Sequence, residues 1–315
     1  MARPGISDED FIHNFETHGA AQTAVVAGVN IRQVYLRRRG IERRLGITIT
    51  APNRRAQPQE YPQRTTYQLD VKNGSVIIGS DAHYWPNDIS TAHLAFCKLS
   101  DELKPKAVIA NGDVVDAASL SRFDPIGWET QPEFADELEA AQARLMEIEE
   151  AAPKAKKIWN LGNHDSRFEG AIAKRLPELK RVKGVHLKDH FPKWITAWAC
   201  FINNDVVVKH RFKGGIHATH NNTMWAGRTM VTGHLHSQKV APFTDYNGTR
   251  WGVDSGTMAE PRGPQFTNYT ELNPLNWRSG FCILTFKDGR LLTPELVSVH
   301  EKGKVEFRGE IIDVE

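Results

Sequence analysis

A chain of 315 residues, with 40 basic and 38 acidic residues, is too long for one ordinary hydrophobic core, so we expect two modules. Three widely spaced cysteines exclude a disulfide framework and a thiolate metal site, and we expect them to be small buried hydrophobic residues. No apolar run approaches the roughly 18 residues that a membrane span needs, and the N-terminus carries acids at positions 8–10 and no apolar signal core, so we expect a cytoplasmic protein without membrane contact.

The first fifty residues show the pattern of a small helical module. Ser7, with an acid three residues later, is typical of a helix start, and Gly19 ends that helix. A second helix of small residues is expected over 20–27, and a third over 31–45. The apolar residues that we expect on the inner face of the third helix are Val34, Ile41 and Leu45.

Ala24, Gly28 and Val34 fall at the spacing of a helix-turn-helix, and this stretch resembles the DNA-binding unit of transposase- and regulator-type proteins. Eight arginines and one acid lie between Arg32 and Arg55, which favours contact with a polyanion. The alternative is a solvated helix in a dimerisation or docking bundle. The residues expected near a DNA groove or its phosphates are Arg32, Gln33, Arg37, Arg38, Arg39, Arg43 and Arg44.

A proline-containing stretch separates this module from the rest of the chain. Residues 51–66 carry three prolines among Asn, Gln and Arg, which is typical of a linker. The expected organisation is a helix-turn-helix module over 1–50, the linker over 51–66 and a second domain over 67–315.

Three glycine-marked strand ends organise the second domain. Apolar runs at 75–79, 107–110 and 157–161 are typical of buried parallel strands, and 89–103 and 133–152 have helical periodicity. Such a β-α-β-α-β layout collects ligands beyond the carboxyl ends of its strands. The side chains expected to meet at this rim, where they favour a divalent metal site, are Asp81, His83, Asp113 and Asn163.

The chain beyond residue 194 has β character, and we expect a second, mostly antiparallel sheet packed against the first. A β-branched run ends in His210, and an apolar run leads into His234 and His236. In an extended segment His234 and His236 point the same way, because side chains alternate with a period of two. Both could then reach one metal cluster.

Asp-x-His, Gly-Asp, Gly-Asn-His-Asp, a strand-end His and Gly-His-x-His occur here in this order. In this order they resemble the motifs of the calcineurin-like metallophosphoesterases, from residue 75 to the C-terminus. The resemblance implies a two-sheet α/β sandwich and a phosphoester hydrolase with two divalent ions. The ligands without thiolate suit Mn²⁺, which we favour, or Fe or Zn²⁺. The implied ligands are Asp81, His83, Asp113 and His236 for one ion, and Asp113, Asn163, His210 and His234 for the other.

Further roles follow from the same resemblance. His164 resembles the family's histidine that contacts the phosphate and helps to protonate the leaving oxygen, with Asp165 orienting its ring. Asp116 is either a partner of a metal ligand or an acid at a helix start. Arg122 and Arg167 are candidates for holding a substrate phosphate, and a surface ion pair is the alternative for Arg167.

The basic module decides which substrate we expect. The family includes protein phosphatases, nucleotide phosphodiesterases and DNA nucleases, and the module favours a DNA-directed phosphodiesterase or nuclease. A helix-turn-helix followed by this domain also resembles bacteriophage architectures, which implies the host cytoplasm. One alternative is a phosphomonoesterase or cyclic-nucleotide phosphodiesterase whose first module docks a partner. Another is a DNA-binding protein with an inactive phosphoesterase scaffold. The oligomeric state stays open.

Overall fold

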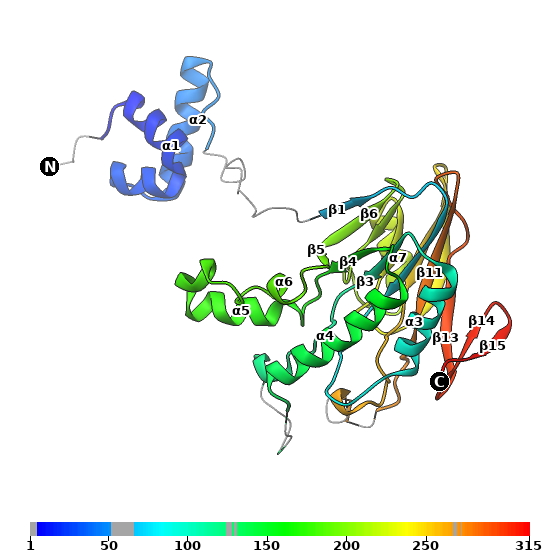
Figure 1. The fold of residues 1–315 in the computed structure, drawn as a ribbon. Coiled ribbons are helices and arrows are strands. Elements are labelled where there is room, and N and C mark those ends of the chain that lie inside the picture. Colours follow the sequence, from blue (N-terminus) through cyan, green and yellow to red (C-terminus); the bar gives the residue numbers. More distant parts are fainter. Residues whose placement is uncertain (1–4, 52–65, 124–127, 129–130, 267–269, 272) are drawn as a thin grey trace. The chain divides into compact units, whose positions relative to one another are not determined.

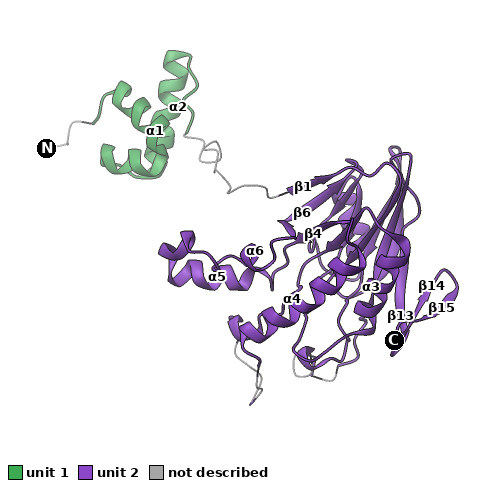
Figure 2. Ribbon diagram, in the orientation of Figure 1, with its two compact units in different colours: residues 1–63 green, residues 64–315 purple. Residues whose placement is uncertain are grey.

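The computed structural model describes residues 5–51, 66–123, 128, 131–266, 270–271 and 273–315. The chain divides into two compact units, residues 1–63 and 64–315 (Figure 2). Most of the expected linker lies outside the described residues, and each unit is therefore described by itself. Within the described part of the chain, no helix is both long and apolar enough to cross a membrane.

The N-terminal unit consists of α1 (Asp8–Ala27) and α2 (Ile31–Leu45). The Ser7 side chain accepts a hydrogen bond from the backbone N–H of Asp10 at 3.0 Å and caps α1, as the sequence predicts. Gly19, with a φ of 80°, interrupts α1, so its two halves match the first two expected helices. The unit thus has the three helical segments that the sequence indicates.

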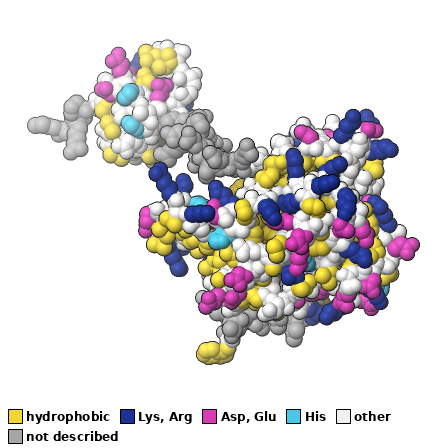
Figure 3. All heavy atoms as spheres, in the orientation of Figure 1, with side chains coloured by type: hydrophobic (Ala, Val, Ile, Leu, Met, Phe, Trp, Pro, Cys, Tyr) yellow, Lys and Arg dark blue, Asp and Glu magenta, His cyan; other side chains and the backbone are white. Residues whose placement is uncertain are grey.

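The small core of this unit corrects one expectation. Leu45 is 51% exposed and does not join the buried face of α2. Gly46 ends the helix in a left-handed conformation, and the chain turns back so that Ile49 is buried instead. The backbone N–H of Ile49 donates to the Glu42 carboxylate at 3.0 Å. The buried residues of the unit are Phe11, Phe15, Ala24, Val34, Ile41 and Ile49, while other hydrophobic side chains lie on its surface (Figure 3).

The second unit is built on two sheets (Figure 1). The nine-stranded sheet has the order β15-β14-β13-β11-β2-β3-β4-β5, with β12 paired to β11, and β2 to β5 are parallel neighbours. Its strands are β2 (Gly74–Gly79), β3 (Ala107–Ala110), β4 (Lys156–Asn160), β5 (Ile195–Ala197), β11 (Gly280–Lys287), β12 (Arg290–Leu291), β13 (Glu295–Glu301), β14 (Lys304–Phe307) and β15 (Glu310–Asp313).

The six-stranded sheet has the order β1-β6-β7-β8-β10-β9 and is mixed, since β7, β8 and β10 run parallel while β6–β7 and β9–β10 are antiparallel pairs. Its strands are β1 (Thr66–Leu69), β6 (Ala199–Ile202), β7 (Val206–Val208), β8 (Thr229–Thr232), β9 (Lys239–Asp245) and β10 (Gly248–Asp254).

Helices cover the sheets and complete the α/β sandwich that the sequence predicts. Helices α3 and α4 pack on the nine-stranded sheet, and α7 packs on β8, β9 and β10 (Figure 1). The helices are α3 (Thr91–Leu103), α4 (Phe134–Ala151), α5 (Ser166–Arg175), α6 (Leu187–His190) and α7 (Ala218–Ala226), with 3₁₀ turns at Ala118–Leu120, Pro177–Arg181 and Pro264–Phe266.

Alternate residues of β2 enter two different cores, as the period of a strand requires. Val76 and Ile78 belong to the cluster that also holds Val231 and Val253 of the six-stranded sheet. Ile77 belongs to the cluster formed with α3 and α4. The strand is buried on both faces, which explains its unbroken apolar sequence.

Two expectations about sheet membership are wrong. The C-terminal strand β11 pairs antiparallel with β2, and β13, β14 and β15 follow beyond it in the nine-stranded sheet, so none of these strands joins the second sheet. The β region that begins after residue 194 does not lie wholly in the second sheet, because it is divided at Trp198 into β5 of the nine-stranded sheet and β6 of the six-stranded sheet. An apolar run indicates that a strand is buried but carries no information on which sheet it enters.

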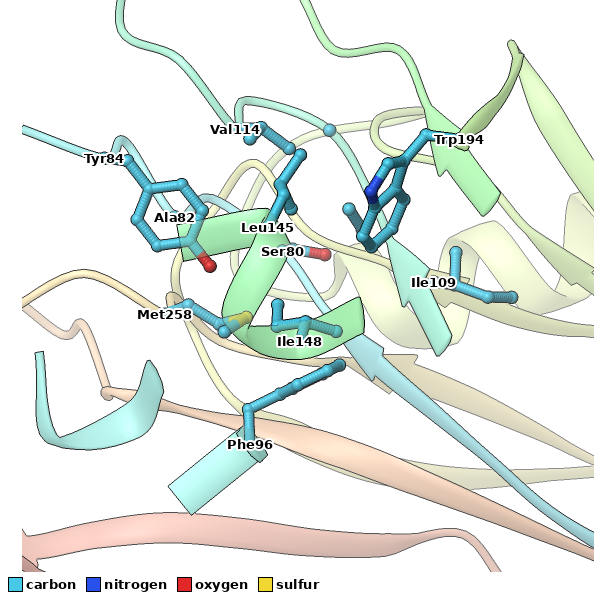
Figure 4. Close-up of a pocket in the computed structure, with 13 residues that line it drawn as sticks. Ser80, Ala82, Tyr84, Phe96, Ile109, Val114, Leu145, Ile148, Trp194 and Met258 are labelled. Atoms are coloured by element: carbon cyan, nitrogen blue, oxygen red, sulfur yellow. The ribbon is translucent and has the colours of Figure 1, made fainter. Parts of the chain in front are cut away.

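The core beneath the first rim loops is closely packed. The side chains of Tyr84, Phe96, Leu145, Trp194 and Met258 converge there (Figure 4). They leave a void of about 10 Å³. A void of this size holds at most one water molecule, so this region supports the rim and is not a ligand site.

Candidate metal centre

All seven predicted ligands lie just beyond the carboxyl ends of strands. Asp81 and His83 follow β2, Asp113 follows β3 and Asn163 follows β4. The remaining ligands follow strands of the other sheet, so the site forms where the carboxyl edges of both sheets meet. These ligands are His210, after β7, and His234 and His236, after β8.

The ligands form two neighbouring groups. In the first, atoms of Asp81, His83 and His236 lie within 4.8 Å of one another, and His236 Nε2 is 3.1 Å from Asp81 Oδ1. In the second, atoms of Asp113, His210 and His234 lie within the same limit, and His210 Nε2 is 3.0 Å from Asp113 Oδ2. His210 Nε2 is also 3.9 Å from Asp81 Oδ1, so the two groups share one site.

Unpartnered polar atoms show that these residues fit divalent ions. Among the described residues, the buried atoms without a hydrogen-bond partner include His83 Nε2, Asn163 Oδ1 and His236 Nδ1. A buried polar atom without a partner is costly, and a bound cation would satisfy it. Carboxylate, imidazole and amide ligands without thiolate suit first-row divalent metals.

The electrostatics of the site agree with this fit. Burial lowers the pKa of His210, but the carboxylates of Asp81 and Asp113 outweigh burial and raise it to about 10. Burial raises the pKa of Asp113, but His210 and His164 outweigh it and hold the pKa well below its usual range. The buried carboxylates thus stabilise positive charge in the site. A proton on His210 supplies that charge here, and divalent cations would supply it on metal binding.

Five of the seven ligands have left-handed backbone conformations, which are rare for residues other than glycine. Their φ angles are 55° for Asp81, 40° for His83, 51° for Asp113, 71° for His234 and 54° for His236. The extended segment expected for His234 and His236 is therefore wrong. The left-handed turns instead direct these two histidines into different ligand groups. Each such residue costs on the order of 1 kcal/mol, which the surrounding domain must offset.

Two motif glycines allow ligands to approach closely. A Cβ atom on Gly162 would lie 2.1 Å from Asp113 Oδ1, and one on Gly233 would lie 2.4 Å from Asp81 Oδ2. Neither distance is compatible with a side chain. Both glycines are thus required by the ligand that packs against them rather than by their own turn.

Asp116 holds two histidines of the site. Its Oδ1 lies 2.8 Å from His83 Nδ1 and 2.9 Å from His164 Nδ1. Burial raises the pKa of Asp116, but hydrogen bonds to His164 and His83 outweigh burial and lower it below its usual range. Of the two interpretations left open by the sequence, the structure supports the one in which Asp116 is the partner of a metal ligand.

Asp165 has a different task from the one expected. Its carboxylate accepts hydrogen bonds from the backbone N–H groups of Gly162, Asp113 and Val114 at 2.7–2.9 Å and from Trp159 Nε1 at 3.0 Å. These donors use both oxygens, so within the described residues Asp116, not Asp165, orients the His164 ring. Asp165 joins the loops after β3 and β4, and the sequence motif alone could not distinguish these roles.

A cavity of about 520 Å³ opens beside the ligands. Of the two arginines predicted to bind phosphate, only Arg167 lines it. Its guanidinium lies 3.2 Å from His164 Nε2 and donates to the Asp116 backbone carbonyl at 2.9 Å. Arg122 is exposed outside the lining, over the Phe123 ring at 4.9 Å. Sequence reasoning missed Trp85, Phe266 and Trp277, which line this cavity together with Phe123.

In the N-terminal unit, internal contacts engage several of the predicted DNA-binding residues. Arg37 donates to the Ile6 carbonyl at 2.6 Å and pairs with Asp8 at 2.9 Å, and Arg44 also pairs with Asp8. Arg38 pairs with Glu42, and the Gln33 side chain caps α2. The arginines that are exposed and have no ion pair among the described residues are Arg32, Arg39 and Arg43.

Comparison with known proteins identifies one family. The model of the calcineurin-like phosphoesterases matches residues 75–246, a region that contains all seven candidate ligands. No curated protein sequence is significantly similar to the chain.

Three solved structures illustrate the structural similarity. Vps29 from Entamoeba histolytica, solved with zinc, is 13% identical with a TM-score of 0.39, over 76% of this chain and 99% of that chain. The phosphoesterase YfcE from E. coli is 17% identical with a TM-score of 0.31, over 70% and 97%. A protein serine/threonine phosphatase from Saccharomyces cerevisiae is 13% identical with a TM-score of 0.37, over 76% and 85%.

Proposed function

The chain belongs to the calcineurin-like phosphoesterase family, and from this premise we propose that it is a metal-dependent phosphodiesterase that acts on DNA. The observation that carries the hydrolytic part is the pair of ligand groups at one rim, linked by the 3.9 Å approach of His210 to Asp81. Such a pair suits two cations on one phosphate.

The seven side chains would hold two divalent ions, with Asp113 shared between them, and Mn²⁺ is the ion that we favour. Bound there, the ions supply Lewis-acid activation of water and of the phosphoryl oxygens. Asp81 and Asp113 are nearly inaccessible to solvent, so they present their charge in a medium that screens it weakly.

His164 is the residue that we propose as the proton donor to the leaving oxygen. Its Nδ1 is held by Asp116, and its Nε2 lies 3.9 Å from Asp113 Oδ2 on the wall of the 520 Å³ cavity. The guanidinium of Arg167 beside it would bind a phosphate oxygen and favour transfer of the proton towards the substrate. Both side chains are partly exposed, so a substrate can reach them.

The N-terminal unit supports DNA as the partner. Its three helical segments and the glycine turn before α2 agree with a helix-turn-helix, and Arg32, Arg39 and Arg43 remain available for phosphates. Three exposed arginines without an ion pair on one helix suit a polyanion such as DNA, whose phosphates they can neutralise.

Assays on four substrates with Mn²⁺ test the proposal: supercoiled DNA, single-stranded DNA, bis-p-nitrophenyl phosphate and p-nitrophenyl phosphate. We expect cleavage of DNA and of the diester, and a decrease of about 10²–10⁴-fold in His164→Asn. The matched control is His300→Asn, a half-exposed histidine on β13. Preference for the monoester without DNA cleavage would overturn the proposal in favour of a phosphomonoesterase.

A further inference from the structure

A second cavity lies against the same metal ligands. It has a volume of about 510 Å³ and is lined by His210 and His234, and His234 also lines the 520 Å³ cavity described above. The candidate metal centre therefore borders two cavities, which share His234 in their walls. A phosphomonoester has a single substituent to accommodate, whereas a diester carries one on each side of its phosphate.

The second cavity is positively charged. Lys209, Arg211 and Lys213 line it, and no carboxylate is among its lining residues. Among the described residues, none of these three side chains takes part in an ion pair. Three uncompensated cations beside a phosphate-binding centre attract a ligand that carries further negative charge.

Aromatic rings line the same cavity. Trp198 is 43% exposed and Phe212 is 49% exposed. Trp198 lies where the chain passes from β5 to β6, between two sheets, so its backbone is held on both sides. Exposed rings interleaved with cations are the features that proteins use to stack nucleobases and to follow a phosphate backbone.

The loop that carries these residues is held in place. The backbone N–H of Lys213 donates to Asn222 Oδ1 at 2.9 Å, and Asn222 is buried on α7. The Lys213 ammonium also lies 4.3 Å from the centre of the Trp225 ring. The segment that carries Arg211, Phe212 and Lys213 is therefore anchored to α7 at Lys213.

We propose that the second cavity binds the nucleotide adjoining the scissile phosphate of a single-stranded nucleic acid. The base stacks against Trp198 and Phe212, and Arg211 with the two lysines binds the next phosphates. A base can stack on side chains only when it has left its own helical stack, which selects single strands over duplexes. The inference rests on the proposed function, because it places the scissile phosphate at the metal ligands.

Binding of a short fluorescein-labelled oligothymidylate to the full-length chain tests this inference, by anisotropy over a salt series with EDTA present to prevent cleavage. We expect Phe212→Ala to weaken binding about tenfold. Arg211→Ala should reduce the slope of log affinity against log salt by about 0.7. The N-terminal unit is unchanged in every variant, so differences report on the cavity.

Tyr246→Ala and Lys302→Ala are matched controls, since both residues are exposed and line neither cavity. Melting curves confirm that each variant is folded. Wild-type affinity in both Phe212→Ala and Arg211→Ala would overturn the inference, as would an equal decrease for a duplex of the same length. If the wild type hydrolyses no ester yet both variants bind oligothymidylate more weakly, the proposed function fails, while the second cavity is still shown to bind single strands.

Discussion

The two units of this protein differ in the burial of their charged residues and in the backbone conformation around them. In the C-terminal unit, Asp81, Asp113 and His210 are buried and hold one another, and neighbouring ligands occupy left-handed backbone conformations. In the N-terminal unit the described arginines are exposed or partly exposed, and among its described residues only glycines have a positive φ. A buried polar cluster with strained backbone indicates a functional site, because the rest of the fold must offset the free energy that the cluster costs. A basic surface indicates only the charge of its partner.

The largest effect on activity is expected from a substitution in the buried ligand cluster of the C-terminal unit. Asp113→Asn removes the carboxylate shared by the two proposed ions, so metal content and diester turnover should both collapse, the latter by about 10³-fold or more. Metal analysis of the purified variant and initial rates with bis-p-nitrophenyl phosphate measure this. Asp101→Asn, an exposed acid on α3, is the control. An Asp113→Asn protein that keeps metal and turnover would contradict the proposed metal centre.

A substitution that moves a ligand without removing it tests whether metal binding depends on the position of the ligands as well as on their presence. Gly162→Ala places a methyl group against Asp113, so we expect weaker metal binding and a decrease in turnover of about 10–100-fold. Gly170→Ala on α5 meets no atom within 4 Å and should leave both unchanged while adding up to about 1 kcal/mol of stability. Equal metal affinities in the two variants would show that the close approach is unimportant.

Substitution of the exposed arginines of the N-terminal unit should have small, additive effects on DNA binding, in contrast to the large effect of a single ligand substitution. Replacing Arg32, Arg39 and Arg43 together by Ala should reduce the salt slope of duplex DNA binding by about 0.9 for each DNA phosphate that these side chains neutralise. Arg37→Ala should instead lower the melting temperature of the unit, because Arg37 bonds to Ile6 and Asp8. A salt slope that is unchanged in the triple variant would favour the docking role for this unit.

The smallest effect concerns Glu137, which supports the loop behind Asp116. Its carboxylate accepts hydrogen bonds from Ala117 and Ala118, and burial, together with the charge of Asp116, raises its pKa to about 7. Because its pKa is higher in the folded than in the unfolded chain, Glu137 adds stability that is fully present when the pH is below the ordinary pKa of a glutamate. This stability is lost as the pH rises through 7. The melting temperature of the wild type should therefore fall relative to that of Glu137→Gln between about pH 5 and pH 8, by at most the equivalent of about 3 kcal/mol. Parallel curves would contradict the shifted pKa.

Much of the local structure was predictable, because it depends on residues close in sequence. The helix expected over 89–103 is α3, which Ser90 caps through a hydrogen bond from the His93 N–H at 3.1 Å. The turn at Asp288 and Gly289 joins β11 to β12 with both residues at positive φ, a conformation that the Asp-Gly pair favours in tight hairpins. The sheet that each later strand would enter was not predictable, since that depends on partners far along the chain.

The sequence by itself determined which side chains end the strands, because an apolar run followed by glycine and a polar ligand type is a local pattern. That was enough to place Asp81, His83, Asp113 and Asn163 on one rim. Only the tertiary structure decided that Asp116 rather than Asp165 pairs with His164, and that two cavities border the candidate metal centre. Those features arise from left-handed backbone turns and from contacts between the two sheets, whose energies come from residues that are distant in sequence.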